Sequence, residues 1–216
     1  HLTEVAKERG IDLRKLPIRI TIHAGEAGAG IPATRHRLET NWAARCYDHS
    51  GMTEVGAYGF ECVAQAGLHI NESEFIAEVI DPATGQPAPE GELVLTNLGR
   101  HGSPIFRYKT GDRVRLDEEP CSCGRSFIRL EGGILGRVDD MLIIRGVNVF
   151  PSALEGIIRQ FEAVDEFQIE VYTQKEMSEI RLLLEVNGDR HGSSAVGETV
   201  KAVVERVRRE IGIRIE

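Results

Sequence analysis

The hydrophobic pattern of this chain changes twice along its length, and this change restricts its fold more than any other feature of the sequence. In residues 1–59, an apolar run at 18–22 comes before a glycine-rich turn at 25–30 and a helical pattern that begins at Pro32. Proline suits the first turn of a helix because a backbone N–H would have no partner there. A strand, a turn and a helix in this order predict the tail of a parallel α/β sheet.

Residues 60–136 contain short β-rich runs that are separated by turn signals such as Pro82–Gly85. Such runs predict an antiparallel β subdomain or a distorted barrel. We expect its strands at 75–80, 92–96, 105–108 and 127–130.

Beyond Gly136 the pattern predicts a compact α+β unit. Its expected elements are a hairpin, a helix opened by Pro151, two strands, a long helix and a last strand, at 141–150, 151–160, 166–172, 180–186, 195–211 and 213–215. The predicted fold class is therefore α/β plus α+β. We expect the C-terminal part of a large domain at 1–136, divided at residue 59, and a small mobile C-terminal domain at 137–216.

The charge of the chain is evenly spread. It has 26 basic and 34 acidic residues, a formal net charge of −8 and no basic stripe. A nucleic acid or an anionic membrane surface is therefore not expected as a partner. The longest apolar runs, such as Met141–Ile144, are far shorter than the roughly 18 residues of a membrane span, and the first residues lack a signal-peptide pattern. We expect a cytoplasmic protein.

Three segments carry most of the functional information: Ser50–Glu54, Tyr108–Asp112 and Gly136–Pro151. In this order and spacing they resemble the adenylate-forming (acyl-CoA synthetase) superfamily. The third segment, together with 92–98 and 103–108, looks most like the phenylacetate-CoA ligase branch. The resemblance covers essentially the whole chain. It implies an acid–thiol ligase of phenylacetate catabolism, in which ATP and an aromatic carboxylic acid give an acyl-adenylate and pyrophosphate, and coenzyme A then displaces AMP.

The resemblance implies a nucleotide site in which Asp112 accepts the ribose hydroxyls and Arg137, 25 positions later, donates to ribose or phosphate oxygens. A carboxylate after a glycine can accept two such bonds, although a solvated turn aspartate is the alternative for Asp112. The implied nucleotide contacts are Gly25, Glu26, Asp48, Gly51, Met52, Thr53, Asp112 and Arg137. For the turn at Gly25, an ordinary strand-to-helix connection remains the alternative.

Thr53 and Glu54 place a hydroxyl and a carboxylate next to each other on one tight loop. Oxygen ligands of this kind suit Mg²⁺ and the α-phosphate of a nucleotide. Together with Arg137, these two residues form the implied catalytic set. The family usually has an aromatic residue where this chain has Ser50.

The resemblance also implies moving parts. Asp139 falls where the family has the hinge between its domains, and Arg145–Gly146 falls in the loop that enters the site for thioester formation, where glycine lets a pantetheine chain approach. The alternatives are that Asp139 caps a fixed turn and that the apolar run around Arg145 belongs to a core.

Two features of the family are missing from this sequence. It has no Ser/Thr/Gly-rich phosphate loop followed by a lysine, and no Gly-Lys motif near its end, since Lys201 lies in a helical pattern. We therefore expect a truncated piece of a longer enzyme that is inactive alone. The alternatives are an adenylyltransferase of the same fold that leaves AMP on its product, and a non-catalytic nucleotide-binding module. The sequence leaves open the acid and the oligomeric state, with a homodimer among the options.

Four cysteines are too few for a disulfide framework in a chain of 216 residues. Cys121 and Cys123 place two thiols one residue apart, and Cys62 and His69 supply a second pair, so the four residues predict a structural zinc site. Unliganded thiols are the alternative, because zinc sites usually space their cysteines by two to four residues. Cys46 is expected to be a buried core thiol.

Overall fold

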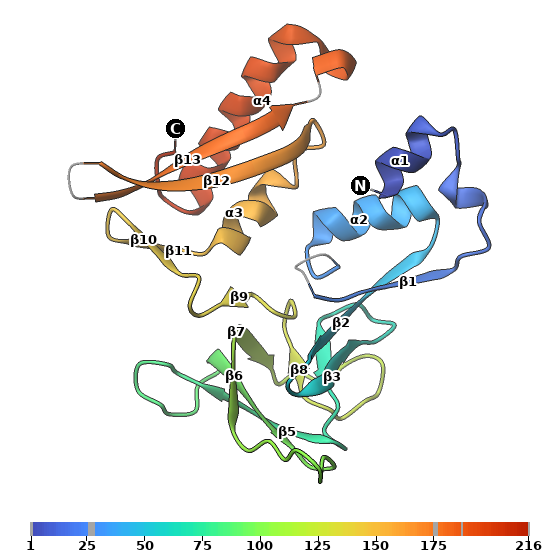
Figure 1. Cartoon of the computed structure of the whole chain (residues 1–216), viewed down its shortest axis with the longest axis vertical. Helices are drawn as coiled ribbons and strands as arrows, with labels where there is room; N and C mark the ends of the chain where they lie inside the picture. Colours follow the sequence, from blue (N-terminus) through green and yellow to red (C-terminus); the bar gives the residue numbers. More distant parts are fainter. Residues whose placement is uncertain (1, 26–28, 175–176, 187, 216) are drawn as a thin grey trace. The chain divides into compact units, whose positions relative to one another are not determined.

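The structure is a computed structural model that describes residues 2–25, 29–174, 177–186 and 188–215. It divides into two compact units, His1–Val138 and Asp139–Glu216, each with its own core (Figure 1). Their elements confirm the predicted combination of α/β and α+β structure. In the described part of the chain, no helix is both long enough and apolar enough to cross a membrane.

The first unit begins with helices around a parallel strand pair. Its elements are α1 Leu2–Glu8, the 3₁₀ helix η1 Leu13–Lys15, β1 Ile20–His23, α2 Pro32–Trp42 and β2 Arg45–Met52. β1 and β2 pair in parallel, with His23 opposite Asp48. The helix α2 begins at Pro32, as predicted, and ends at Ala43, whose φ of 49° turns the chain toward β2. This segment is the predicted α/β portion.

A curved antiparallel sheet continues from β2. Its further strands are β3 Gly56–Glu61, β4 Leu68–Ile70, β5 Phe75–Ile80, β6 Glu90–Asn97, β7 Tyr108–Asp117, β8 Arg129–Leu130 and β9 Gly136–Arg137. The described strands pair in the order β1-β2-β3-β4-β8-β7-β6-β5, and β9 pairs with β7. One core lies among them, and it includes Tyr58, Leu68, Leu93, Leu95 and Leu130. The antiparallel β subdomain was therefore predicted correctly.

Two local expectations in this unit are wrong. Among the described residues, 105–107 lie outside any strand, because Arg107 has a φ of 47° that an extended strand cannot contain. Ser50–Met52 was expected in a loop but forms the end of β2, where Ser50 pairs with Gly59 of β3. Only residues 53–55 form the turn between these strands.

The second unit contains two hairpins and two helices. Its elements are β10 Leu142–Ile144, β11 Val147–Val149, α3 Pro151–Ile158, β12 Val164–Gln174, β13 Met177–Val186 and α4 Gly188–Glu210. Both strand pairs are antiparallel. Apolar residues at helical spacing in α3 and α4 face one core, and the fully or nearly fully buried ones include Leu154, Ile157, Ile158, Val203 and Val207. The hairpin and both helices were predicted, although α4 begins before Ala195.

The strand expected at 213–215 is wrong. In the described structure these residues join no sheet, yet Ile213 and Ile215 are buried in the core of the second unit and Arg214 is exposed. The alternation of apolar and polar residues here reflects which side chains are buried in the core, and it imitates the two-residue period of a strand without pairing in a sheet.

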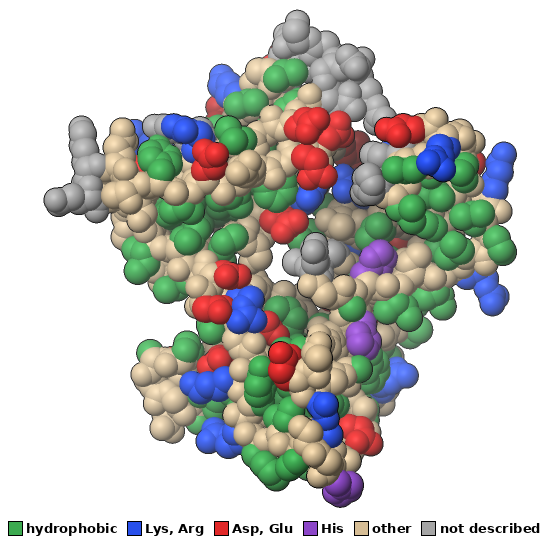
Figure 2. All heavy atoms as spheres, viewed as in Figure 1, with side chains coloured by type: hydrophobic (Ala, Val, Ile, Leu, Met, Phe, Trp, Pro, Cys, Tyr) green, Lys and Arg blue, Asp and Glu red, His purple; other side chains and the backbone are tan. Residues whose placement is uncertain are grey.

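Charged side chains of both signs are interspersed on the molecular face drawn in Figure 2. Among the described residues on that face, no continuous basic patch is visible.

Candidate functional site

The best-defined polar arrangement lies where β7 meets β9. Asp112 of β7 is the Cα partner of Arg137 of β9, and Arg137 Nη1 lies 3.7 Å from Asp112 Oδ1. The hydroxyl of Tyr58, on β3, donates to Asp112 Oδ2 at 3.2 Å. The hydroxyl of Thr110 accepts from the Asp112 N–H at 3.0 Å and donates to the carbonyl oxygen of Leu93 at 2.9 Å. Three strands therefore position one carboxylate.

Gly111 makes the close approach of Arg137 feasible. Its φ is +77°, and a Cβ at this position would lie 2.5 Å from Arg137 Nη2. The guanidinium therefore lies directly against the backbone of Gly111, and Arg137 Nη1 donates to the Thr110 carbonyl oxygen at 3.3 Å. Glycine suits this position because of its left-handed backbone, and its missing side chain lets the guanidinium lie where it does.

Burial differs across this arrangement. The Asp112 side chain is 13% exposed and that of Arg137 is 46% exposed. Burial raises the pKa of the Tyr58 hydroxyl, with a further contribution from the Asp112 charge, so the hydroxyl stays a donor at neutral pH. A fixed carboxylate beside a half-exposed guanidinium can bind a ligand that carries both hydroxyl donors and anionic oxygens. The bond from Tyr58 was not predicted, because Tyr58 lies 54 positions before Asp112. The bonds of Thr110 were not predicted either, although Thr110 belongs to the Tyr108–Asp112 segment.

Thr53 and Glu54 lie at the exposed turn between β2 and β3. The guanidinium of Arg100 donates to the Glu54 carbonyl oxygen. Gly51 pairs with Ala57, and a Cβ at Gly51 would lie 3.1 Å from the Ala57 Cα, so this strand end is tightly packed. The hydroxyl of Thr53 and the carboxylate of Glu54 are oxygen donors of the type that Mg²⁺ prefers.

Met52 and Ser50 are less exposed than Thr53 and Glu54. Met52 packs against the core of the first unit. Ser50 is 8% exposed, and a Cβ built on Gly59 would lie 3.1 Å from the Ser50 Cβ. The β2–β3 pairing therefore already restricts the space at Ser50.

A second polar group surrounds Asp48, which lines a cavity of about 560 Å³. The Asp48 N–H donates to Glu61 Oε2 at 3.0 Å, and Glu61 Oε1 accepts from Arg35 Nη2 at 2.7 Å. Burial raises the pKa of the Asp48 carboxyl. Gly25, which follows β1, has a φ of 91°, and Glu26 lies outside the described residues. The Arg35–Glu61 ion pair was not predicted, because its partners are 26 positions apart.

In the second unit, Arg145 and Gly146 form the tip of the β10–β11 hairpin. Their φ values are 49° and 82°, as in a two-residue hairpin turn. Arg145 Nε donates to Glu179 Oε1, on β13, at 2.6 Å, and the Glu179 side chain is 7% exposed. Asp139 is the first residue of this unit. Glu179 was not predicted, since nothing local marks a carboxylate that pairs with a turn 34 positions earlier.

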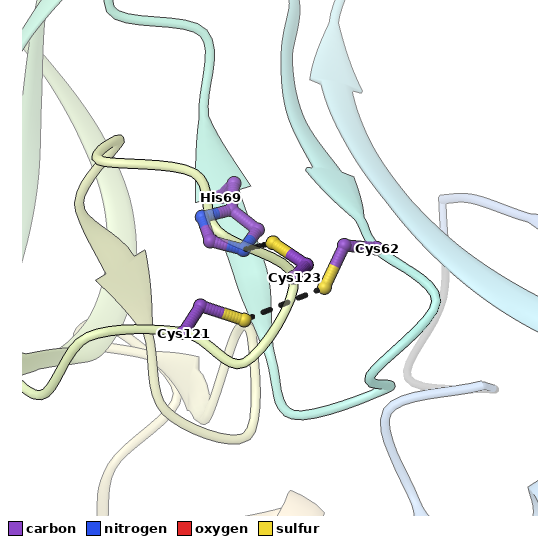
Figure 3. Close-up of side chains that lie close together, drawn as sticks. All are labelled: Cys62, His69, Cys121 and Cys123. Atoms are coloured by element: carbon purple, nitrogen blue, oxygen red, sulfur yellow. Dashed lines mark hydrogen bonds between the residues drawn. The ribbon is translucent and has the colours of Figure 1, made fainter.

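The four predicted zinc ligands lie together in the first unit (Figure 3). Their ligand atoms are all within 4.8 Å of one another. The closest pairs are Cys62 Sγ to Cys121 Sγ and Cys123 Sγ to His69 Nε2, each at 3.6 Å. The backbone N–H of Arg125 is the main cause that lowers the pKa of the Cys123 thiol to about 6. Cys46 is fully buried elsewhere, as predicted.

Comparison with known proteins identifies relatives of the chain. Residues 146–216 match the family described as AMP-binding enzyme C-terminal domain. A phenylacetate-coenzyme A ligase of Thermus thermophilus is 38% identical over 193 residues, which is 86% of this chain and 43% of that protein. The Pseudomonas putida phenylacetate-coenzyme A ligase is 33% identical over 196 residues, covering 88% and 43%.

A solved structure extends this similarity to the fold. The crystal structure of 2-hydroxyisobutyryl-CoA ligase in the postadenylation state matches with a TM-score of 0.92 and 31% identity, over 100% of this chain and 48% of that chain. The chain thus spans less than half the length of these relatives. Its similarity is to the C-terminal portion of the phenylacetate-CoA ligase branch of the adenylate-forming superfamily.

Proposed function

We propose that this chain is the nucleotide-holding and thioester-forming portion of an ATP-dependent acid–CoA ligase that uses an aromatic carboxylic acid. The observation that carries the proposal is the Asp112–Arg137 pair. The pairing of β7 with β9 places the two residues opposite each other, and the Tyr58 hydroxyl donates to Asp112. The phenylacetate-coenzyme A ligases at 33–38% identity support the choice of an aryl acid.

In the proposed first step, an oxygen of the acid carboxylate attacks the α-phosphate of ATP and pyrophosphate leaves. Asp112 accepts bonds from the ribose hydroxyls, and Arg137 donates to ribose or phosphate oxygens. No side chain forms a covalent bond, so catalysis consists of positioning and charge stabilisation. Thr53 and Glu54 are the residues that would hold Mg²⁺, which supplies positive charge beside the phosphates.

In the proposed second step, the coenzyme A thiol attacks the acyl carbonyl carbon and AMP leaves. We assign the hinge to Asp139 and the approach of the pantetheine chain to the turn at Arg145–Gly146, where Gly146 has no side chain in the way. We also propose one structural Zn²⁺ at the cluster of Cys62, His69, Cys121 and Cys123, with no part in the reaction. A cytoplasmic location and a homodimer stay predictions.

Nucleotide binding tests the central assignment. Isothermal titration of the purified chain with AMP should show binding that Asp112→Asn weakens at least tenfold, because bonds to an ionised acceptor contribute about 1.5–3 kcal/mol each. Asparagine keeps the size of the side chain and an oxygen that can accept from Tyr58. The control is Asp165→Asn, an exposed residue of the second unit, which should leave affinity unchanged. Equal affinities for the two variants, or no binding by the unaltered chain, would overturn the assignment.

Two alternatives keep the nucleotide site and change its use. In an adenylyltransferase, AMP stays on the product. In a binding module no reaction occurs, and the lack of a phosphate loop in this sequence favours that alternative for the chain alone. A chimera in which this chain replaces the matching part of the Thermus thermophilus relative distinguishes the ligase, the adenylyltransferase and the binding module. Pyrophosphate exchange distinguishes an enzyme from a module, and AMP release that depends on coenzyme A distinguishes the ligase. The isolated chain should show no exchange.

A further inference from the structure

The four-residue cluster joins two segments that are far apart in the sequence. Cys62 directly follows β3, and His69 belongs to β4. Cys121 and Cys123 come from the long loop 118–128, which connects β7 to β8. Figure 3 shows the four side chains pointing toward one another, two from each segment.

Two of the separations match those of a tetrahedral zinc site, and all four ligand atoms lie within 4.8 Å of one another. With a Zn–S bond of about 2.3 Å and a Zn–N bond of about 2.0 Å, neighbouring ligand atoms lie roughly 3.5–3.8 Å apart. The Cys62–Cys121 and Cys123–His69 pairs are both at 3.6 Å. A disulfide between Cys62 and Cys121 would need about 2.05 Å and would leave the other pair unused.

The hydrogen bonding of His69 prepares it as a ligand. Its Nδ1 lies 3.1 Å from the carbonyl oxygen of Phe127, which can only accept, so Nδ1 carries the hydrogen. The lone pair is then on Nε2, the atom that faces Cys123. Metal-binding histidines are commonly oriented by such a bond on the second nitrogen. The imidazole is fully buried, which holds this orientation.

The donor set favours zinc over harder cations. Three thiolates and one imidazole nitrogen are soft or borderline ligands, whereas Mg²⁺ and Ca²⁺ take oxygen ligands. Four protein ligands complete a tetrahedral shell and leave no position for a substrate. The chemistry of the cluster is therefore structural.

Few side chains of the loop that carries two of the ligands are buried. In residues 118–126, all of which the structure describes, the only buried side chain is that of Cys121, and Cys123 is half-buried. The Gly124 N–H donates to the Cys121 carbonyl oxygen within the loop. The Arg125 guanidinium lies 5.7 Å from the Phe60 ring centroid, an exposed contact that contributes little.

We propose that one Zn²⁺, bound by Cys62, His69, Cys121 and Cys123, orders the loop 118–126 by fastening it to the β3–β4 segment. This role rests on the structural zinc proposed above and is independent of the nucleotide site. Without the metal, the loop keeps its ends, at Asp117 and at Phe127–Ile128, and loses the fixed positions between them.

Metal analysis and limited proteolysis test the proposal on the same preparation. Protein purified without chelator should contain about one zinc per chain. Trypsin cleavage after Arg125, an exposed residue of the loop, should become at least about tenfold faster when a chelator removes the metal. Cleavage after Arg100, which is exposed in another loop, is the internal control and should not change.

Two variants complete the design. Cys121→Ser should lose zinc and be cleaved after Arg125 as fast as the chelated protein, whereas Ser122→Ala, at the exposed neighbour, should behave like the unaltered chain. If the protein contains zinc but cleavage after Arg125 is unchanged by the chelator, the ordering role is wrong and only the zinc site stands. Absence of zinc would overturn both. Neither result bears on AMP binding, so the ligase proposal fails or stands by its own measurement.

Discussion

Both units contain carboxylate–arginine pairs, and two of these pairs, Asp112–Arg137 in the first unit and Glu179–Arg145 in the second, differ in closeness. In the second unit, Glu179 accepts from Arg145 at 2.5–2.6 Å. In the first unit, Arg137 Nη1 lies 3.7 Å from Asp112 Oδ1, and Asp112 also accepts from Tyr58. Both arginines are about half exposed, at 48% and 46%. The tight pair holds a turn in place, whereas the wider separation of the other pair suits the nucleotide contacts proposed for Asp112 and Arg137.

The largest effect should come from breaking the tight pair. Arg145→Met leaves the buried Glu179 carboxylate without its closest partner, so we expect the free energy of unfolding to fall by about 2 kcal/mol, below the 3–5 kcal/mol of fully buried pairs because Arg145 is half exposed. Arg137→Met should cost less than about 1 kcal/mol. Urea denaturation measures both, and equal losses would contradict the comparison. Adding Glu179→Gln to Arg145→Met should recover part of the loss, because a neutral amide is easier to bury.

A smaller effect should separate backbone strain from the placement of Arg137. Gly111→Ala and Gly85→Ala both put a side chain at a positive φ, of 77° and 69°, which costs roughly 1–2 kcal/mol of stability. Only at Gly111 does the new Cβ displace a guanidinium, and the flexible arginine can move away at little further cost. We therefore expect similar stability losses but weaker AMP binding only for Gly111→Ala. Unchanged AMP affinity in that variant would show that the position of Arg137 is unimportant for the nucleotide.

The smallest effect concerns the hydroxyl of Thr110, which supports the first pair. Thr110→Val keeps the shape of a buried side chain but removes its bonds with Asp112 and Leu93, so we expect a stability loss of about 1 kcal/mol. AMP affinity should fall by roughly twofold to fivefold as the carboxylate loosens. Thr173→Val, at an exposed position of β12, should change neither quantity. A Thr110→Val protein with unaltered stability would mean that these two bonds are replaced by water.

Much of the secondary structure could be predicted because its causes are local. Pro32 and Pro151 begin helices where a missing N–H is harmless, and Arg145–Gly146 turns a hairpin because both residues take a positive φ. The errors also have local explanations. Arg107 interrupts an apolar run with a left-handed backbone, and Ile213–Ile215 alternates like a strand while packing on a core.

The candidate sites were predictable only in part. Asp112 and Arg137 were predicted because of a family resemblance, and the cluster of Cys62, His69, Cys121 and Cys123 because cysteine and histidine are rare enough to be noticed as a set. Tyr58 and Glu179 carry no such signal, since a tyrosine or a glutamate in a strand is ordinary until the fold provides its partner.

The sequence by itself determined the order and type of most elements, the family, and the residue types available for binding, because periodicity, turn residues and motifs act over a few neighbouring positions. Only the tertiary structure decided which of these residues meet. The curvature of the sheet brought Tyr58 of β3 to Asp112 of β7 across 54 positions, although these strands are not paired, and folding of the loop brought Cys121 to Cys62 across 59. Such contacts depend on the path of the whole chain and on the burial that fixes it, and neither can be read from a local stretch of sequence.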